Sequence, residues 1–221
     1  MSTKVRSFCA NCVIAALLLA AGDGLSASRR TSTSAAPCTN RLEATYRGGV
    51  VTPPLTKPQF TLTNTSGTPF DFRAETQGYV TLLFFGYTHC PDECPMHMAA
   101  IATSLKRLAP EVRNQVKVVF VTADPARDTP SVLRAWLDRF DGQFIGLTGD
   151  AATIEAAQRL ARVPAASKIL LANRGYQIGH ASFVLAYTKD NLAHVIYPGG
   201  VTPTDWAHDL PLLVKEIWSS Q

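Results

Sequence analysis

The sequence predicts an α/β domain in which a central mixed β-sheet is flanked by helices. The run 79–85 is continuously apolar, which is typical of a central strand that is covered on both faces, and the largely apolar run 116–121 is predicted to be a second buried strand. A segment with helical spacing of its apolar residues follows each run. Two further strand-like segments, 181–187 and 192–197, are joined by a short polar turn. Strands that alternate with helices before a late hairpin favour a sheet of mixed strand direction.

The domain is predicted to open with a β-hairpin. Apolar and polar residues alternate in 60–63 and in 70–72, on either side of a Ser-Gly turn. The first continuous apolar run comes next. A helix then begins near Cys94, because apolar residues recur behind it at helical spacing, and Pro110 ends this helix.

The second apolar run leads through the polar turn 122–129 to another helix. Pro130 is a favourable first residue for that helix. A short strand is predicted at 144–147, and a helix over 151–161 is capped by Asp150. The sequence therefore continues the alternation of strand and helix.

The last predicted element is a helix over 203–218. Thr202 and Asp205 have the spacing of a capping box at its start. No internal repeat and no second domain is apparent.

The amino-acid composition limits the classes of function that the protein can have. A chain of 221 residues with 46% hydrophobic content can hold one domain with a substantial core. The net charge is +4, but Lys and Arg are scattered and form no dense run among aromatic residues. This distribution gives no support to nucleic-acid binding, so we expect no nucleic-acid partner.

Residues 1–27 are typical of an export signal. Lys4 and Arg6 precede an apolar stretch at 12–21, and small residues at 25–27 offer a cleavage site. A bilayer span needs about 20 residues, so we favour a cleaved signal peptide over a retained membrane anchor. The expected location is extracytoplasmic, in a bacterial periplasm, with the protein soluble or anchored to the membrane by its N-terminus.

Residues 28–57 are predicted to be a flexible leader, and 58–221 to be the domain. The leader is rich in Ser, Thr, Ala and Pro and has no apolar periodicity. Cys9 and Cys12 lie in the signal, and Cys38 lies in the leader without an evident role.

Two cysteines lie where a buried strand turns into a helix. The decapeptide 86–95 (GYTHCPDECP) places Cys90 and Cys94 four positions apart, so that they face the same side of any helical turn they share. A helix N-terminus favours the thiolate form that both metal binding and redox chemistry need. The pair can bind a metal ion or form a disulfide, and in an oxidising compartment a purely structural disulfide is the alternative.

Three segments together resemble the Sco/SenC family. They are 86–95, 121–130 (VTADPARDTP) and 144–149 (FIGLTG). Members of that family are copper-binding, thioredoxin-like assembly factors for cytochrome c oxidase. The resemblance extends from about Pro58 to the C-terminus and implies a thioredoxin-like fold with an N-terminal β-hairpin.

A copper site of two cysteines needs a third ligand. Two thiolates and one imidazole form a compact site that suits Cu(I) and also accepts Cu(II). The resemblance implies His180, because the metal-binding histidine of the family lies just before the penultimate strand. Gly179 and Ala181 stand where the family usually has Asp and Ser, so a carboxylate that would support the ligand is missing. The other candidates are His89, His97, His194 and His208.

Charged residues border the predicted site. Asp92 and Glu93 lie between the cysteines, where carboxylates stabilise a cation but also raise the thiol pKa values. Asp124 follows the second central strand at the same sheet edge, and we expect it to support the ligands. Arg127 and Asp128 are expected to brace this turn, although Asp128 is also a candidate helix cap.

His89 and the cluster 96–98 have less specific roles. His89 precedes Cys90, and we expect it to lower the pKa of that thiol or to support the loop. Met96, His97 and Met98 offer an access route for a soft metal, although Met at helical spacing usually fills a core.

The resemblance implies a copper chaperone that carries one copper ion on Cys90, Cys94 and His180. It would act as a binding and transfer protein rather than an enzyme, with the copper-binding subunit of cytochrome c oxidase or another copper-accepting protein as its target and a copper-donor chaperone as its source. The alternative is a thiol-disulfide reductase in which Cys90 and Cys94 are the catalytic pair and keep the target's own copper-ligand cysteines reduced.

Overall fold

A computed structural model describes residues 46–172 and 175–215 of the chain. The predicted signal peptide, Cys38 and the last three residues of the predicted C-terminal helix lie outside these ranges. No helix within 46–172 and 175–215 has the length and hydrophobicity that crossing a bilayer requires.

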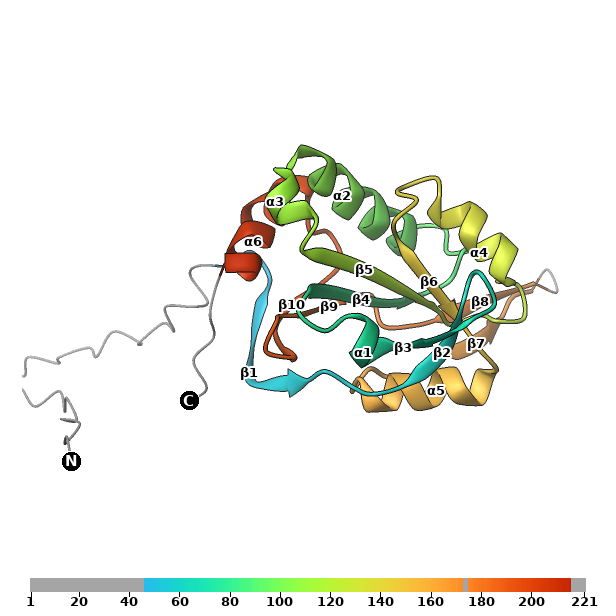
Figure 1. Cartoon of the computed structure of the whole chain (residues 1–221). Helices are drawn as coiled ribbons and strands as arrows, with labels where there is room; N and C mark the ends of the chain where they lie inside the picture. Colours follow the sequence, from blue (N-terminus) through green and yellow to red (C-terminus); the bar gives the residue numbers. More distant parts are fainter. Residues whose placement is uncertain (1–45, 173–174, 216–221) are drawn as a thin grey trace, which may run out of the picture. The chain divides into compact units, whose positions relative to one another are not determined.

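The domain is built on an eight-stranded sheet in the order β1-β10-β9-β4-β5-β6-β2-β3 (Figure 1). Strands β4, β5 and β6 are parallel, and every other neighbouring pair is antiparallel. The predicted mixed sheet is therefore confirmed. Its strands are β1 Gly49–Thr56, β2 Thr61–Asn64, β3 Pro69–Asp71, β4 Val80–Gly86, β5 Val116–Thr122, β6 Ile145–Thr148, β9 Val184–Tyr187 and β10 Leu192–Tyr197.

Helices cover both faces of the sheet, which explains why β4 is buried along its whole length. Alternate residues of β4 supply the two cores: Leu82 and Phe84 pack in one cluster, and Leu83 and Phe85 pack in the other. Helices α2, α4 and α6 contribute to the first core, while α1 and α5 contribute to the second (Figure 1). The helices are α1 Phe72–Glu75, α2 Glu93–Arg107, α3 Pro110–Arg113, α4 Pro130–Leu137, α5 Ala151–Leu160 and α6 Pro203–Lys215.

The predicted helix starts are confirmed by their hydrogen bonds. The backbone N–H of Thr153 donates to the Asp150 carboxylate at the start of α5 over 2.7 Å. Before α6, Thr202 and Asp205 bond each other as the capping box requires. These local interactions fix where each helix leaves the sheet edge.

The predicted start of the domain was wrong. Residues 49–56 were expected to belong to the flexible leader, but they form β1, an edge strand that pairs with β10. None of its residues is fully buried, and it contains Pro53 and Pro54, which are tolerated at a sheet edge. Because β1 lacks a buried face, its sequence lacks the alternation that reveals a strand.

A second two-stranded sheet was not predicted. Strands β7 Ser167–Leu170 and β8 Tyr176–Gly179 pair with each other in antiparallel register. All residues of β7 are exposed, so no apolar periodicity marks it. The strand expected from Ala181 begins at Val184 instead. His180 therefore lies in the short connection between β8 and β9.

Candidate metal centre

The two cysteines lie at the C-terminal end of the central strand β4. That strand ends at Gly86, and α2 begins at Glu93. Only Cys94 lies on the helix, where its side chain is fully buried. Cys90 lies in the preceding loop and is half-buried, with its N–H bonded to the carbonyl of Tyr87. The expectation that both thiols face one side of a shared helical turn is therefore corrected: the loop, not the helix, brings them together.

His180 approaches the cysteines from a distant part of the sequence. Its Nε2 lies 3.4 Å from the Sγ of Cys94 and 3.9 Å from the Sγ of Cys90. One ligand atom from each of the three residues lies within 4.8 Å of the other two. The structure thus brings together the three side chains that the family resemblance implies.

The orientation of the imidazole suits a ligand. The Nδ1 of His180 lies 3.0 Å from the carbonyl oxygen of Ala181. Because that oxygen only accepts, Nδ1 carries a proton and Nε2 faces the sulfur atoms. The rings of Phe84 and Tyr87 pack edge-on against the imidazole. A backbone carbonyl thus supplies the hydrogen-bond acceptor, although Gly179 replaces the family's carboxylate.

Both thiols are free, and their proton affinities are far apart. The hydrogen bond with the Cys94 thiol, together with one from His180, lowers the pKa of Cys90 to about 3 in spite of its burial. Burial, followed by the neighbouring Cys90 thiolate, raises the pKa of Cys94. Burial lowers the pKa of His180, but the bonds with Cys90 and Ala181 outweigh it and leave this pKa above its ordinary value. The reduced pair therefore holds a thiolate on Cys90 and a proton on Cys94.

Asp128 fixes the loop that carries Cys90. Its fully buried carboxylate accepts from the N–H of Thr88 at 2.9 Å and from the Thr88 hydroxyl at 2.6 Å. The hydroxyl of Thr122, the last residue of β5, donates to it at 2.7 Å. The bracing role predicted for Asp128 is confirmed, and the cap of α4 is Thr129.

Asp124 reaches the site through β8. Its carboxylate accepts from the hydroxyl of Tyr176 at 3.0 Å and pairs with Arg127. The guanidinium of Arg127 also stacks on the ring of Tyr176, 3.7 Å from its centroid. These contacts hold the strand that ends one residue before His180. The support that we predicted from Asp124 would therefore act through Tyr176.

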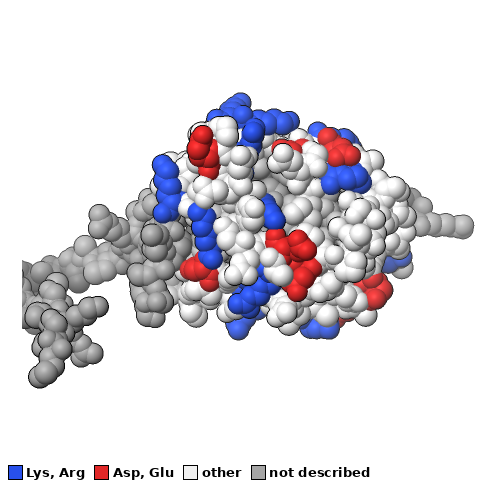
Figure 2. Space-filling model, in the orientation of Figure 1, with Lys and Arg blue, Asp and Glu red and all other residues white. Residues whose placement is uncertain are grey.

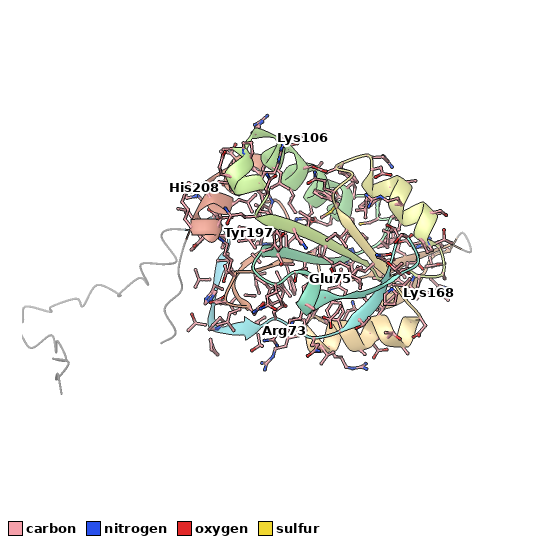
Figure 3. The ribbon with its side chains drawn as sticks, viewed as in Figure 1. Arg73, Glu75, Lys106, Lys168, Tyr197 and His208 are labelled. Carbon is pink, nitrogen blue, oxygen red and sulfur yellow. The ribbon has the colours of Figure 1, made fainter. Side chains whose placement is uncertain are left out.

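The other histidines contact partners away from the sulfur atoms. His89 lies 3.0 Å from the Thr88 hydroxyl, and the Nε2 of His97 bonds the carbonyl of Ser182. Burial lowers the pKa of His97 below its ordinary value. His194 and His208 bond acidic residues, Asp190 and Asp209. His208 is labelled in Figure 3 at the opposite end of the domain from Lys168 of β7.

The acidic residue next to Cys94 lines a pocket that neither cysteine lines. Glu93, the exposed Met96 and His97 line this pocket from α2, and residues 200–203 line it from the segment that leads into α6. One carboxylate oxygen of Glu93 lies 3.9 Å from the Nε2 of His97. Met98 is part of the core, as Met at helical spacing usually is.

The fold and the site define the class of protein: a thioredoxin-like domain with two thiols and one imidazole at the C-terminal edge of its sheet. The chain belongs to the SCO1/SenC family, whose family model matches residues 51–215.

Curated relatives agree with this assignment. Protein SenC of Rhodobacter capsulatus is 39% identical over 105 residues, which are 43% of this chain and 47% of the relative. The mitochondrial protein SCO2 of Saccharomyces cerevisiae is 31% identical over 125 residues, 56% of this chain and 41% of the relative. The chain thus spans about half the length of the curated relatives it matches.

Solved structures resemble the domain along almost their whole length. ScoI of Bradyrhizobium japonicum, determined with copper bound, is 31% identical with a TM-score of 0.64, covering 72% of this chain and 99% of that one. The apo Sco1 protein of Thermus thermophilus is 28% identical with a TM-score of 0.68, covering 76% of this chain and 97% of that one.

Proposed function

We propose that the protein is a copper chaperone that carries one copper ion on Cys90, Cys94 and His180 and delivers it to the binuclear copper centre of cytochrome c oxidase. The observation that carries the proposal is the approach of the three ligand atoms to within 4.8 Å of one another. Thiolate is a soft ligand that favours Cu(I), and the imidazole allows the same site to accept Cu(II). A similar structure, ScoI of Bradyrhizobium japonicum, was determined with copper bound.

The chemistry of the three side chains suits a site that binds a copper ion and later releases it. Cys90 is already a thiolate and is half-buried, so an incoming ion meets an anionic sulfur first. Cys94 has to release its proton to become a ligand, and its full burial keeps water from that sulfur. His180 keeps its orientation through the carbonyl of Ala181. Delivery then requires only exchange of ligands, with no change in oxidation state.

The test is the amount of copper that the reduced full chain retains after a chelator challenge. We expect about one copper per chain, and loss of that copper in His180→Ala. His89→Ala is the matched control, because His89 is next to Cys90 but contacts Thr88 rather than a sulfur atom. Equal retention by the His180→Ala variant and the parent would remove His180 from the ligand set. Failure of the parent to retain copper would end the chaperone proposal.

The unequal pKa values favour a second candidate, a thiol-disulfide reductase. The Cys90 thiolate would attack a target disulfide, forming a mixed disulfide and releasing one target thiolate. Cys94 would then lose its proton and attack Cys90, which gives a Cys90–Cys94 disulfide and frees the second target thiol. Two electrons pass from the dithiol to the target. The same sulfur atoms cannot hold copper while they are oxidised, so the two functions would exclude each other at any moment.

A further inference from the structure

The free end of the β7–β8 hairpin exposes three consecutive apolar side chains. Ile169, Leu170 and Leu171, which we call the apolar tip, are 49%, 78% and 37% exposed. They make up half of the six large hydrophobic residues that are exposed in the described ranges. Single exposed hydrophobic residues are ordinary, but a contiguous group beside unpaired strand edges indicates an interaction site.

The hairpin is fixed to the domain, so the exposure of its tip is not the result of a loosely attached segment. Ile178 of β8 is buried in the first core. The Arg127 guanidinium donates to the carbonyl of Tyr176 at 3.2 Å, and the Tyr176 hydroxyl donates to Asp124. The ring of Tyr176 lies between two cations, Arg127 at 3.7 Å and Lys168 at 3.8 Å from its centroid. The hairpin thus presents its tip from a rigid base.

The apolar tip is continuous with the candidate metal centre. Strand β8 ends at Gly179, and the next residue is His180. Two strand residues separate Gly179 from Tyr176, which is paired with Leu170, so the three residue steps along the strand span about 10 Å. A protein that receives an ion from the two cysteines and His180 has to cover this edge of the domain. It would therefore meet the tip as well.

We propose that the apolar tip, with Lys168 at its base, is the surface on which the copper-receiving protein docks, and that the matching surface of that protein is apolar with an acidic rim. The proposal rests on the copper-delivery function proposed above. Lys168 is exposed and lies at the same end of the domain as the hairpin, as Figure 3 shows. Its charge would attract acidic residues and orient the partner before contact.

The charges also distinguish this occupant from a second copy of the chain. A symmetric dimer through the tip would bring the exposed Lys168 side chains of both copies into one interface. Like charges that face each other across an interface disfavour that pairing. The face of the domain seen in Figure 2 carries both signs of charge in scattered groups.

The experiment compares four chains against the copper-accepting soluble domain of the cytochrome c oxidase subunit. They are the parent, Leu170→Ser, Lys168→Glu and the control Leu160→Ser, which changes a leucine that is 54% exposed at the end of α5. Affinity of the copper-free chains for the domain is measured by titration calorimetry. The rate of copper transfer is measured from loaded chains, to the domain and to a small chelator.

We expect Leu170→Ser and Lys168→Glu to lower the affinity and the transfer rate to the domain by about tenfold, the effect of losing about 1.4 kcal/mol of binding free energy. Transfer to the chelator should not change, since the chelator has no surface to dock, and Leu160→Ser should match the parent throughout.

Two results would overturn the docking proposal in distinguishable ways. If all four chains bind the domain and transfer copper equally, the tip is not the docking surface, while copper delivery stands. If the parent retains copper but neither binds the domain nor passes copper to it, then delivery to this acceptor fails as well. Sedimentation and binding to anionic lipid vesicles identify a different occupant: self-association or vesicle binding that Leu170→Ser abolishes would assign the tip to a second copy or to a membrane.

Discussion

Gly86 and Cys94 approach each other so closely that no side chain fits between them. A Cβ atom at Gly86 would lie 2.7 Å from the Sγ of Cys94, which is shorter than side-chain carbons tolerate, and 2.9 Å from the ring of Phe84. The last residue of β4 therefore has to be glycine if the sulfur is to keep its position. A residue that cannot bind metal thus sets the position of a candidate ligand.

The first prediction follows from this contact. Gly86→Ala should displace the Cys94 sulfur and lower copper retention at least tenfold, because a shift of the sulfur weakens its bond to any ion held with Cys90 and His180. Copper per chain after a chelator challenge is the measurement. Gly142→Ala is the control, since the nearest atom to its added Cβ lies 3.8 Å away. If both variants retain as much copper as the parent, the surrounding loop moves to accommodate the added Cβ atom, and the contact with Gly86 does not determine copper binding.

A second prediction concerns the reactivity of the free thiols. The pKa of Cys90 is lowered to about 3, so its thiolate is fully formed from about pH 5 upward. The rate of Cys90 alkylation by iodoacetamide should therefore stay flat between pH 5 and pH 8, whereas an ordinary thiol gains about tenfold per pH unit. Peptide mass spectrometry separates Cys90 from the buried Cys94. A steep rise in Cys90 alkylation over this range would contradict the assigned protonation.

A third prediction concerns Asp128. Asp128→Asn should lower the free energy of unfolding by about 1–3 kcal/mol, because one of its oxygens becomes an NH₂ group that cannot accept from Thr88 or Thr122. Urea unfolding of the reduced chain measures this change. Asp138→Asn serves as the comparison, because Asp138 is exposed and only pairs with Arg134 on the surface. Similar losses in the two variants would mean that the Asp128 contacts contribute little to stability.

A fourth prediction uses a buried lysine far from the site in sequence. Lys57 is fully buried and donates to Thr76 and Thr81, with no carboxylate among these partners. Burial, together with the charges of Arg73 and Lys117, lowers its pKa from 10.5 to about 8. Between these two values the unfolded chain binds the proton more strongly than the folded chain, so this residue makes stability rise as the pH increases from about 8 to 10.

The variants Lys57→Met and Lys106→Met separate this effect from the rest of the titration. Lys106 is exposed, so its loss should leave the pH dependence of unfolding unchanged. Lys57→Met should remove the rise between pH 8 and pH 10 that the parent shows on top of its other titrations. Identical pH profiles for the parent and Lys57→Met would mean that Lys57 stays charged in the folded chain.

The sequence predicted those parts of the fold that have a buried face. The apolar runs of β4 and β5 and the caps of α5 and α6 agree with the structure, because burial and capping leave local patterns. Strands β1 and β7 were missed because they have no buried face: β1 pairs with the distant β10 at the sheet edge, and all residues of β7 are exposed. The β7–β8 hairpin, which positions His180, therefore left no signal.

In the candidate site, too, some features were visible in the sequence and others were not. The spacing of Cys90 and Cys94 was visible in the sequence, and the family resemblance pointed to His180. The reach of Asp128 back to Thr88, forty positions away, was not visible, because a carboxylate in a turn has the same local pattern whether it caps a helix or bonds another loop. The link from Asp124 through Tyr176 to β8 needed the missed hairpin.

The separation of the ligands along the chain has one more consequence. His180 lies 86 residues after Cys94 and 90 after Cys90. An ion bound to all three residues would act as a cross-link that closes this long segment, and it would stabilise the folded chain by mass action as any ligand of the native state does. Transfer of the ion would open that cross-link. The melting temperature of the domain should therefore be higher with copper bound than without it.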